Sequence, residues 1–186
     1  MDALSPLLPK GGSQLVTNPH QRWVNQQITQ KQARLLKPDR FIFAPVRNPW
    51  SRVVSHYKDK IVASLHDRLA QYGFKEAMPF PDYLRVVDAE YDRINDFHII
   101  EQIRILTYKD TYLPDFTLKF ERLGEDFEAL CAMLRARTGV SVAGLGRLNS
   151  RPSQSYTAYY EPPQLDIVKR VYARDIQALN YAYPAA

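Results

Sequence analysis

The stretch that decides the fold is residues 41–57, which read Phe-Ile-Phe-Ala-Pro-Val-Arg-Asn-Pro-Trp-Ser-Arg-Val-Val-Ser-His-Tyr. Residues 40–46 form a short apolar run typical of a buried strand. Pro45 has no amide hydrogen to donate, so we expect a bulge or a sheet edge there. Asn48 and Pro49 then supply an N-cap side chain and a proline at the first helical position. The stretch therefore predicts a buried strand that passes directly into a helix.

On both sides of this stretch, helical patterns alternate with strand patterns. Apolar spacing predicts helices over 20–36, 81–93, 97–106, 125–137 and 162–179, and a second strand over 116–120. Such alternation is typical of an α/β fold with a mainly parallel sheet. A length of 186 residues fits one domain, so we expect a single domain over 1–186.

The composition is that of an ordinary globular protein, with 45% hydrophobic and 24% charged residues, which excludes a disordered or fibrous chain. No run of about 18 apolar residues could span a membrane, and the first residues lack the pattern of a secretory signal. The single cysteine, Cys131, excludes an intramolecular disulfide, and we expect it in the core. These features predict a cytoplasmic protein. Peripheral association with a membrane and loss of an N-terminal part of the chain are left open.

Basic residues gather just before and after the predicted strand. Residues 31–60 hold eight Lys or Arg and two Asp, and eight minus two gives +6, more than the +5 of the whole chain. Such a region attracts phosphates, sulfates or nucleic acid, and a solvated helix face is the alternative. Because the charges converge on one strand-to-helix junction, nucleic acid is disfavoured. Arg47 offers a forked donor there, and the helix N-terminus offers unpaired amides, so we expect an anion site.

The same stretch resembles a known motif. The pattern Phe-x-Phe-x-x-Val-Arg-Asn-Pro-Trp-x-Arg-Val-Val-Ser-x-Tyr in residues 41–57 resembles the 3′-phosphate motif of sulfotransferases that use 3′-phosphoadenylyl sulfate (PAPS). It is most similar to the carbohydrate-type branch, with heparan sulfate 2-O- and chondroitin 4-O-sulfotransferase relatives and bacterial members. The resemblance continues in order through residues 96–102, 119–127 and 148–181. It implies that Arg47 and Ser55, eight positions apart, hold the 3′-phosphate of the nucleotide.

The resemblance also implies a three-layer sandwich like that of P-loop NTPases, with a short, mainly parallel sheet and a phosphate loop near the N-terminus. Residues 9–14, Pro-Lys-Gly-Gly-Ser-Gln, resemble the loop for the 5′-phosphosulfate. The residues implied to bind there are Lys10, Gly11, Gly12 and Ser13. The alternative is a flexible Gly-Gly leader on a truncated chain. Arg151, in a loop in the C-terminal part of the chain, would also contact the 3′-phosphate. The alternative, of equal weight, is that Arg151 is an ordinary surface arginine.

The activity implied is transfer of a sulfuryl group from PAPS to a hydroxyl acceptor, with a carbohydrate as the expected class and no metal required. Lys10 would neutralise charge on the leaving phosphate oxygen. His98, two residues after Asp96, would act as the general base, and a helix-cap or interface histidine is the alternative. A second function stays open: a catalytically degenerate nucleotide-binding or interaction module that binds 3′,5′-adenosine bisphosphate without turnover.

Overall fold

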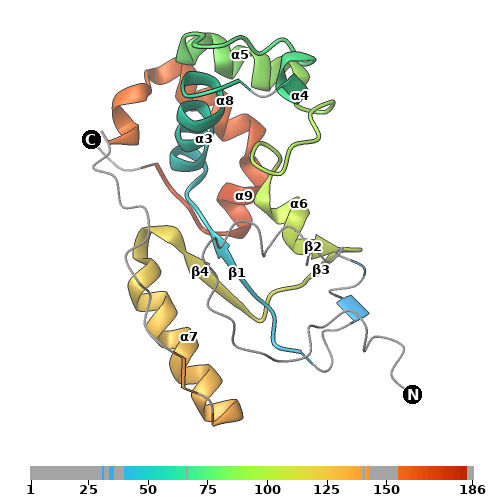
Figure 1. Ribbon diagram of the computed structural model, residues 1–186, viewed down its shortest axis with the longest axis vertical. Helices are drawn as coiled ribbons and strands as arrows, with labels where there is room; N and C mark the ends of the chain where they lie inside the picture. Colours follow the sequence, from blue (N-terminus) through green and yellow to red (C-terminus); the bar gives the residue numbers. More distant parts are fainter. Residues whose placement is uncertain are drawn as a thin grey trace.

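The computed structural model describes residues 31, 34–35, 40–65, 67–139, 141–142 and 155–183. Within them the chain alternates helices and short strands (Figure 1). In chain order the elements are β1 (Phe43–Val46), α3 (Pro49–Tyr57), η2 (Lys58–Val62), α4 (Asp67–Ala70), α5 (Phe80–Glu90), α6 (Gln102–Leu106), β2 (Thr107–Tyr108), β3 (Thr111–Tyr112), β4 (Phe116–Lys119), η3 (Phe120–Arg122), α7 (Leu123–Thr138), η4 (Tyr156–Tyr159), α8 (Pro162–Val171) and α9 (Ala173–Ala178).

A short parallel sheet joins the two predicted strands. β1 pairs with β4 in parallel, from Phe43 opposite Phe116 to Val46 opposite Lys119. This confirms a mixed α/β architecture with a short parallel sheet. The predicted buried strand is buried only at its end, because Phe43 is 49% exposed and only Val46 of β1 is buried. Burial begins where β1 runs into α3, and the start of the strand lies away from the helical core.

An antiparallel hairpin was not predicted. β2 and β3 pair with Thr107 opposite Tyr112, and the turn residues Lys109 and Asp110 both have positive φ, 45° and 62°. Two positive φ angles define a tight two-residue hairpin turn, for which Asn-Gly is the usual sequence signal. Lys-Asp is a poor signal for that turn, so the sequence pattern did not reveal it.

The main core lies between three helices, α3, α5 and α8, which gather at the top of Figure 1. α3 begins at Pro49 as predicted, with the Asn48 side chain as its cap. Its buried face continues into the π-helical turn η2. The buried residues shared by these helices include Trp50, Val53, Val54, Tyr57, Ile61, Tyr83, Leu84, Val87, Val168 and Tyr172.

Two predicted helices differ from the observed ones. The helix expected over 162–179 is broken at Tyr172, which has φ −111° and ψ 28°, into α8 and α9. The helix expected over 97–106 begins only at Gln102. Asp175, in the first turn of α9, accepts hydrogen bonds from the amides of Gln102 (2.8 Å) and Ile103 (2.7 Å). This carboxylate therefore caps α6 from a distant part of the chain.

The helix α7 lies at the lower left of Figure 1 and is exposed over most of its length. Its buried residues are Asp126 and Leu130, and Cys131 is half-buried rather than in the core as expected. With 16 residues α7 is the longest helix in the described part of the chain. No described helix is long and apolar enough to cross a membrane.

Candidate functional site

Arg47 follows the last residue of β1 and directs a charged side chain to the junction of β1, β4 and α3. Its Nε donates to the Ser51 hydroxyl at 2.8 Å, and its guanidinium carbon lies 4.6 Å from the centre of the Phe120 ring. Burial lowers the pKa of Arg47, and the nearby Glu121 opposes this shift. The group stays charged at neutral pH. Its two terminal nitrogens have no hydrogen-bond partner among the described residues, so they can bind an anion.

Three polar residues share one face of the strand-to-helix junction. Arg47, Ser51 and Ser55 are spaced by four, which places Ser51 and Ser55 one above the other on α3. Ser51 is 6% exposed, and the hydroxyl of Ser55 has no hydrogen-bond partner within the described part of the chain. The role of Ser51 was missed from sequence, although its spacing of four from both neighbours was a signal.

The amides at the start of α3 are not free, which corrects one prediction. The Asn48 side chain accepts from the amides of Trp50 (3.1 Å) and Ser51 (3.3 Å), and the Asn48 carbonyl accepts from Arg52 (2.8 Å). Pro49 has no amide hydrogen. The cap thus uses the donors that a bound anion would need. An anion here would be held by side chains and by the positive helix end.

Two carboxylates fix the backbone around Arg47. Glu121 accepts from the Asn48 amide (2.7 Å) and from the Tyr181 hydroxyl (3.1 Å), and no ion pair between Glu121 and Arg47 is found in the described structure. Asp126 accepts from the Lys119 amide at 2.6 Å. These contacts explain why carboxylates stand after β4: they satisfy backbone donors where the parallel ladder ends.

His98 lies on the loop before α6, in a turn made by Asp96. One Asp96 oxygen accepts from the His98 amide (2.7 Å) and lies 2.9 Å from His98 Nδ1. The hydrogen bond to His98 holds the pKa of Asp96 at about 2. The His98 side chain is 67% exposed. A bond from Nδ1–H to the carboxylate leaves Nε2 as the nitrogen that can accept a proton.

A second imidazole behind His98 was missed from sequence. His56 Nδ1 lies 2.9 Å from the Tyr83 hydroxyl, and the His56 ring centre is 6.3 Å from that of His98. Burial lowers the pKa of His56 to about 4, and its Nε2 is buried with no hydrogen-bond partner in the structure described. His56 is therefore a neutral imidazole at neutral pH.

Arg52, one residue after Ser51, joins α3 to the loop that carries His98. Arg52 donates to the carbonyls of Phe97 and Ile100, which fixes the loop that carries His98. Consecutive helical residues are about 100° apart, so the face of Arg52 adjoins the face of Ser51 and Ser55 rather than coinciding with it. The loop that carries His98 and the junction at Arg47 therefore contact neighbouring faces of α3.

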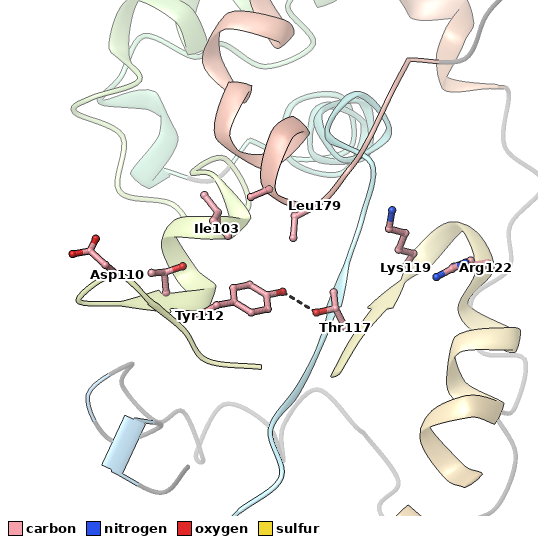
Figure 2. Close-up of a pocket in the computed structure, with 9 residues that line it drawn as sticks. Ile103, Asp110, Tyr112, Thr117, Lys119, Arg122 and Leu179 are labelled. Atoms are coloured by element: carbon pink, nitrogen blue, oxygen red, sulfur yellow. Dashed lines mark hydrogen bonds between the residues drawn. The ribbon is translucent and has the colours of Figure 1, made fainter. Parts of the chain in front are cut away.

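Apart from the junction at Arg47, a cavity of about 510 Å³ lies between the β2–β3 hairpin, β4 and the end of α9 (Figure 2). Tyr112 donates to or accepts from Thr117 across it (2.8 Å). Its two cations are already paired: Lys119 donates to the Asn180 carbonyl (3.0 Å), and Arg122 pairs with Asp126 (3.0 Å). This cavity is consequently a poorer anion site than the junction at Arg47.

The remaining predicted site residues lie outside the described residues. They are Lys10, Gly11, Gly12, Ser13 and Arg151. Their predicted contacts with the nucleotide stay predictions.

Comparison with known proteins gives the family. The model of the sulfotransferase family matches residues 10–182, nearly the whole chain. No curated protein and no solved structure matches the chain significantly. The match includes β1, α3 and the junction at Arg47, together with every other element described above. The chain belongs to the sulfotransferase family.

Proposed function

We propose that this protein transfers a sulfuryl group from PAPS to a hydroxyl acceptor, with carbohydrates as the acceptor class. Family membership supports sulfuryl transfer, and the likeness of residues 41–57 to the carbohydrate-type branch supports the narrower assignment. The observation that carries the proposal is the state of Arg47: a partly buried cation, oriented by Ser51 and Phe120, whose terminal nitrogens have no hydrogen-bond partner among the described residues.

The described residues fit the 3′-phosphate of the nucleotide. Arg47 would bind two phosphate oxygens through its terminal nitrogens, and the Ser55 hydroxyl would donate to a third. The guanidinium lies over the Phe120 ring, a cation–π contact that stabilises its orientation. The residues proposed for the 5′ end are Lys10, Gly11, Gly12 and Ser13, with Arg151 proposed to contact the 3′-phosphate as well.

Besides binding the nucleotide, sulfuryl transfer requires a proton acceptor and a group that stabilises negative charge. The nucleotide supplies an activated sulfuryl group when bound. His98 accepts the acceptor's hydroxyl proton at Nε2, and Asp96 holds the ring in the tautomer that leaves Nε2 unprotonated. Lys10 stabilises negative charge on the phosphate side. We further propose that the protein acts in the cytoplasm and has no nucleic acid partner.

Calorimetry with 3′,5′-adenosine bisphosphate tests the anion site directly. Arg47→Ala should weaken binding by ~2–4 kcal/mol, because a charge-assisted, forked contact is lost. Arg85→Ala is the matched control, since Arg85 is exposed on α5 and pairs with Asp82. Unchanged affinity of Arg47→Ala would rule out this residue as the 3′-phosphate ligand.

A screen of polysaccharides and small phenols with labelled PAPS tests turnover. Lys10→Ala should lower the rate by a factor on the order of a hundred, as removal of a preorganised charge stabiliser typically does. His98→Asn should lower kcat while the affinity for the bisphosphate stays the same. Binding of the bisphosphate without turnover of any acceptor would favour the degenerate binding module over an enzyme.

A further inference from the structure

The backbone of Arg47 is held by one side chain from a distant part of the chain. Gln102, the first residue of α6, accepts from the Arg47 amide through Oε1 (2.8 Å) and donates from Nε2 to the Arg47 carbonyl (2.8 Å). β1 ends at Val46, so the ladder with β4 does not extend to Arg47. Gln102 thus makes the two bonds that a neighbouring strand would otherwise make.

Asp175 fixes the orientation of that glutamine. Its Oδ2 accepts from the Gln102 amide (2.8 Å) and from Gln102 Nε2 (3.2 Å), and its Oδ1 accepts from the Ile103 amide (2.7 Å). Asp175 is 0% exposed and Gln102 is 7% exposed. An ionised carboxylate only accepts hydrogen bonds, so Nε2 must face Asp175 and Oε1 must face the Arg47 amide.

We propose that Gln102, oriented by Asp175, is a positioning residue that sets the preference of this site for nucleotides carrying a 3′-phosphate. The inference rests on the proposed function of Arg47. A forked contact needs the guanidinium within about 0.5 Å of its productive place. The side chain of Arg47 is held by Ser51 and Phe120, whereas Gln102 holds its backbone. The residues proposed for the 5′ end of the nucleotide belong to another segment, 10–13, so we expect Gln102 to act on binding of the 3′-phosphate.

The test compares two nucleotides that differ only in the 3′-phosphate. The affinities of 3′,5′-adenosine bisphosphate and adenosine 5′-monophosphate are measured by calorimetry. The nucleotide that binds more weakly is measured by a competition titration against the other. Gln102→Ala should lower the ratio of the two affinities at least tenfold and change the monophosphate affinity less than twofold. Gln102→Glu should do the same, because it keeps the size and the acceptor but loses the Nε2 donor and faces Asp175 with a second carboxylate.

The chain offers a matched control in Gln164. It is a buried glutamine, 8% exposed, whose Oε1 accepts from the Glu161 amide at the start of α8. Gln164→Ala removes a comparable buried amide without touching Arg47, so the ratio should stay at the wild-type value. A fall in the ratio as large as that of Gln102→Ala would show general loosening and overturn the positioning role.

A measurement on the free protein separates this inference from the proposed function. Hydrogen exchange of the Arg47 amide, followed by NMR, should accelerate at least tenfold in Gln102→Ala and not in Gln164→Ala. A wild-type protein without preference for the bisphosphate would overturn the proposed function, whatever the exchange rates. A clear wild-type preference that Gln102→Ala retains would overturn the inference alone. If Gln102→Ala does not fold, Gln102→Glu and Asp175→Asn carry the same measurements.

Discussion

Ser51 orients the Arg47 guanidinium, since its hydroxyl accepts from Nε, and the terminal nitrogens have no partner in the part of the chain that the structure describes. Ser51→Ala should weaken binding of 3′,5′-adenosine bisphosphate by ~1 kcal/mol, because Nε loses its neutral partner and the side chain gains freedom. Calorimetry checks this, with the exposed Ser64→Ala as control. The result would be contradicted if Ser51→Ala bound the bisphosphate as tightly as the wild type does.

His56 makes the stability of the fold depend on pH. Its pKa is about 4 in the folded protein because the ring is buried, against about 6.5 for an unfolded chain. As the pH falls from 7 to 4.5, the unfolded state therefore binds a proton that the folded state does not, and the free energy of unfolding decreases. His56 alone should contribute about 2 kcal/mol to this decrease.

Urea unfolding at pH 7 and pH 4.5 measures that contribution. His56→Asn removes the titrating ring, so it should lose less stability on acidification than the wild type by the amount given above. Tyr83→Phe is the control, because it removes the hydrogen bond at Nδ1 but keeps the imidazole. If the free energy of unfolding fell equally between pH 7 and pH 4.5 in the wild type and in His56→Asn, the buried ring would not be the cause of the loss of stability in acid.

At this scale the sequence showed the candidate residues better than the contacts that hold them. Arg47 and Ser55 lie within one local motif, so the sequence alone could propose them together, and their binding of phosphate stays a prediction. Gln102 lies 55 residues from Arg47, and only its place in a motif, not its contact with the Arg47 backbone, was visible. The free amides expected at α3 were an error of a different kind, because the Asn48 that marks a helix start also occupies its donors.

At the scale of elements, α3 depends on its cap more than on its composition, since it has nine residues and no acidic residue in its first turn. Asn48→Ala removes the acceptor for two amides and the bond from Nδ2 to the Ala182 carbonyl (3.1 Å). It should lower the free energy of unfolding by about 1–2 kcal/mol, the usual range for a lost N-cap.

The matched control for this cap is Ser155, which caps the four-residue η4 from an exposed position with a bond of 3.4 Å. In urea unfolding, Ser155→Ala should lower the free energy of unfolding by less than half as much as Asn48→Ala does. Asn48→Asp should keep most of the wild-type stability, because a carboxylate caps equally well at the positive helix end. A destabilisation by Asn48→Asp equal to that of Asn48→Ala would show that the bond to Ala182, rather than the cap, is what matters.

Elements with local signals were predictable and the others were not. Proline at the first turn marked the starts of α3 and α8 correctly. The start of α6 depends on Asp175, which is 73 residues away, so no window around Gln102 contains the reason. The same carboxylate lies just after the break at Tyr172, where an uninterrupted apolar stripe predicted one helix.

In the whole molecule, residues 179–183 tie the parallel sheet to the helical core. Their carbonyls accept from Lys119 and from the Asn48 side chain, while Tyr181 donates to Glu121. Every one of these partners adjoins Arg47 or the end of β4. The backbone around Arg47 thus depends on the last described part of the chain, a dependence that no sequence pattern near Arg47 shows.

Tyr183 links residues 179–183 to the helical core through aromatic contacts. Its ring packs edge-on against Trp50 at 5.5 Å between centres, and it also contacts Tyr156 and Tyr160. Full truncation of a buried aromatic side chain costs about 3–5 kcal/mol, and Tyr183 is half-buried. Tyr183→Ala should therefore lower the free energy of unfolding by about 2 kcal/mol, and the Tm by about 4–8 °C for a chain of this length.

Calorimetric unfolding of Tyr183→Ala should remain a single transition, because Trp50 belongs to the core shared by α3, α5 and α8. Tyr112→Ala is the control: its hydroxyl contacts Thr117 at the cavity edge, so its loss should cost below about 1 kcal/mol. Since Tyr183 lies beside the start of α3, Tyr183→Ala should also weaken bisphosphate binding, whereas Tyr112→Ala should not. Wild-type stability in Tyr183→Ala would mean that residues 179–183 are held by their polar bonds and by the buried Leu179, without a contribution from the Tyr183 ring.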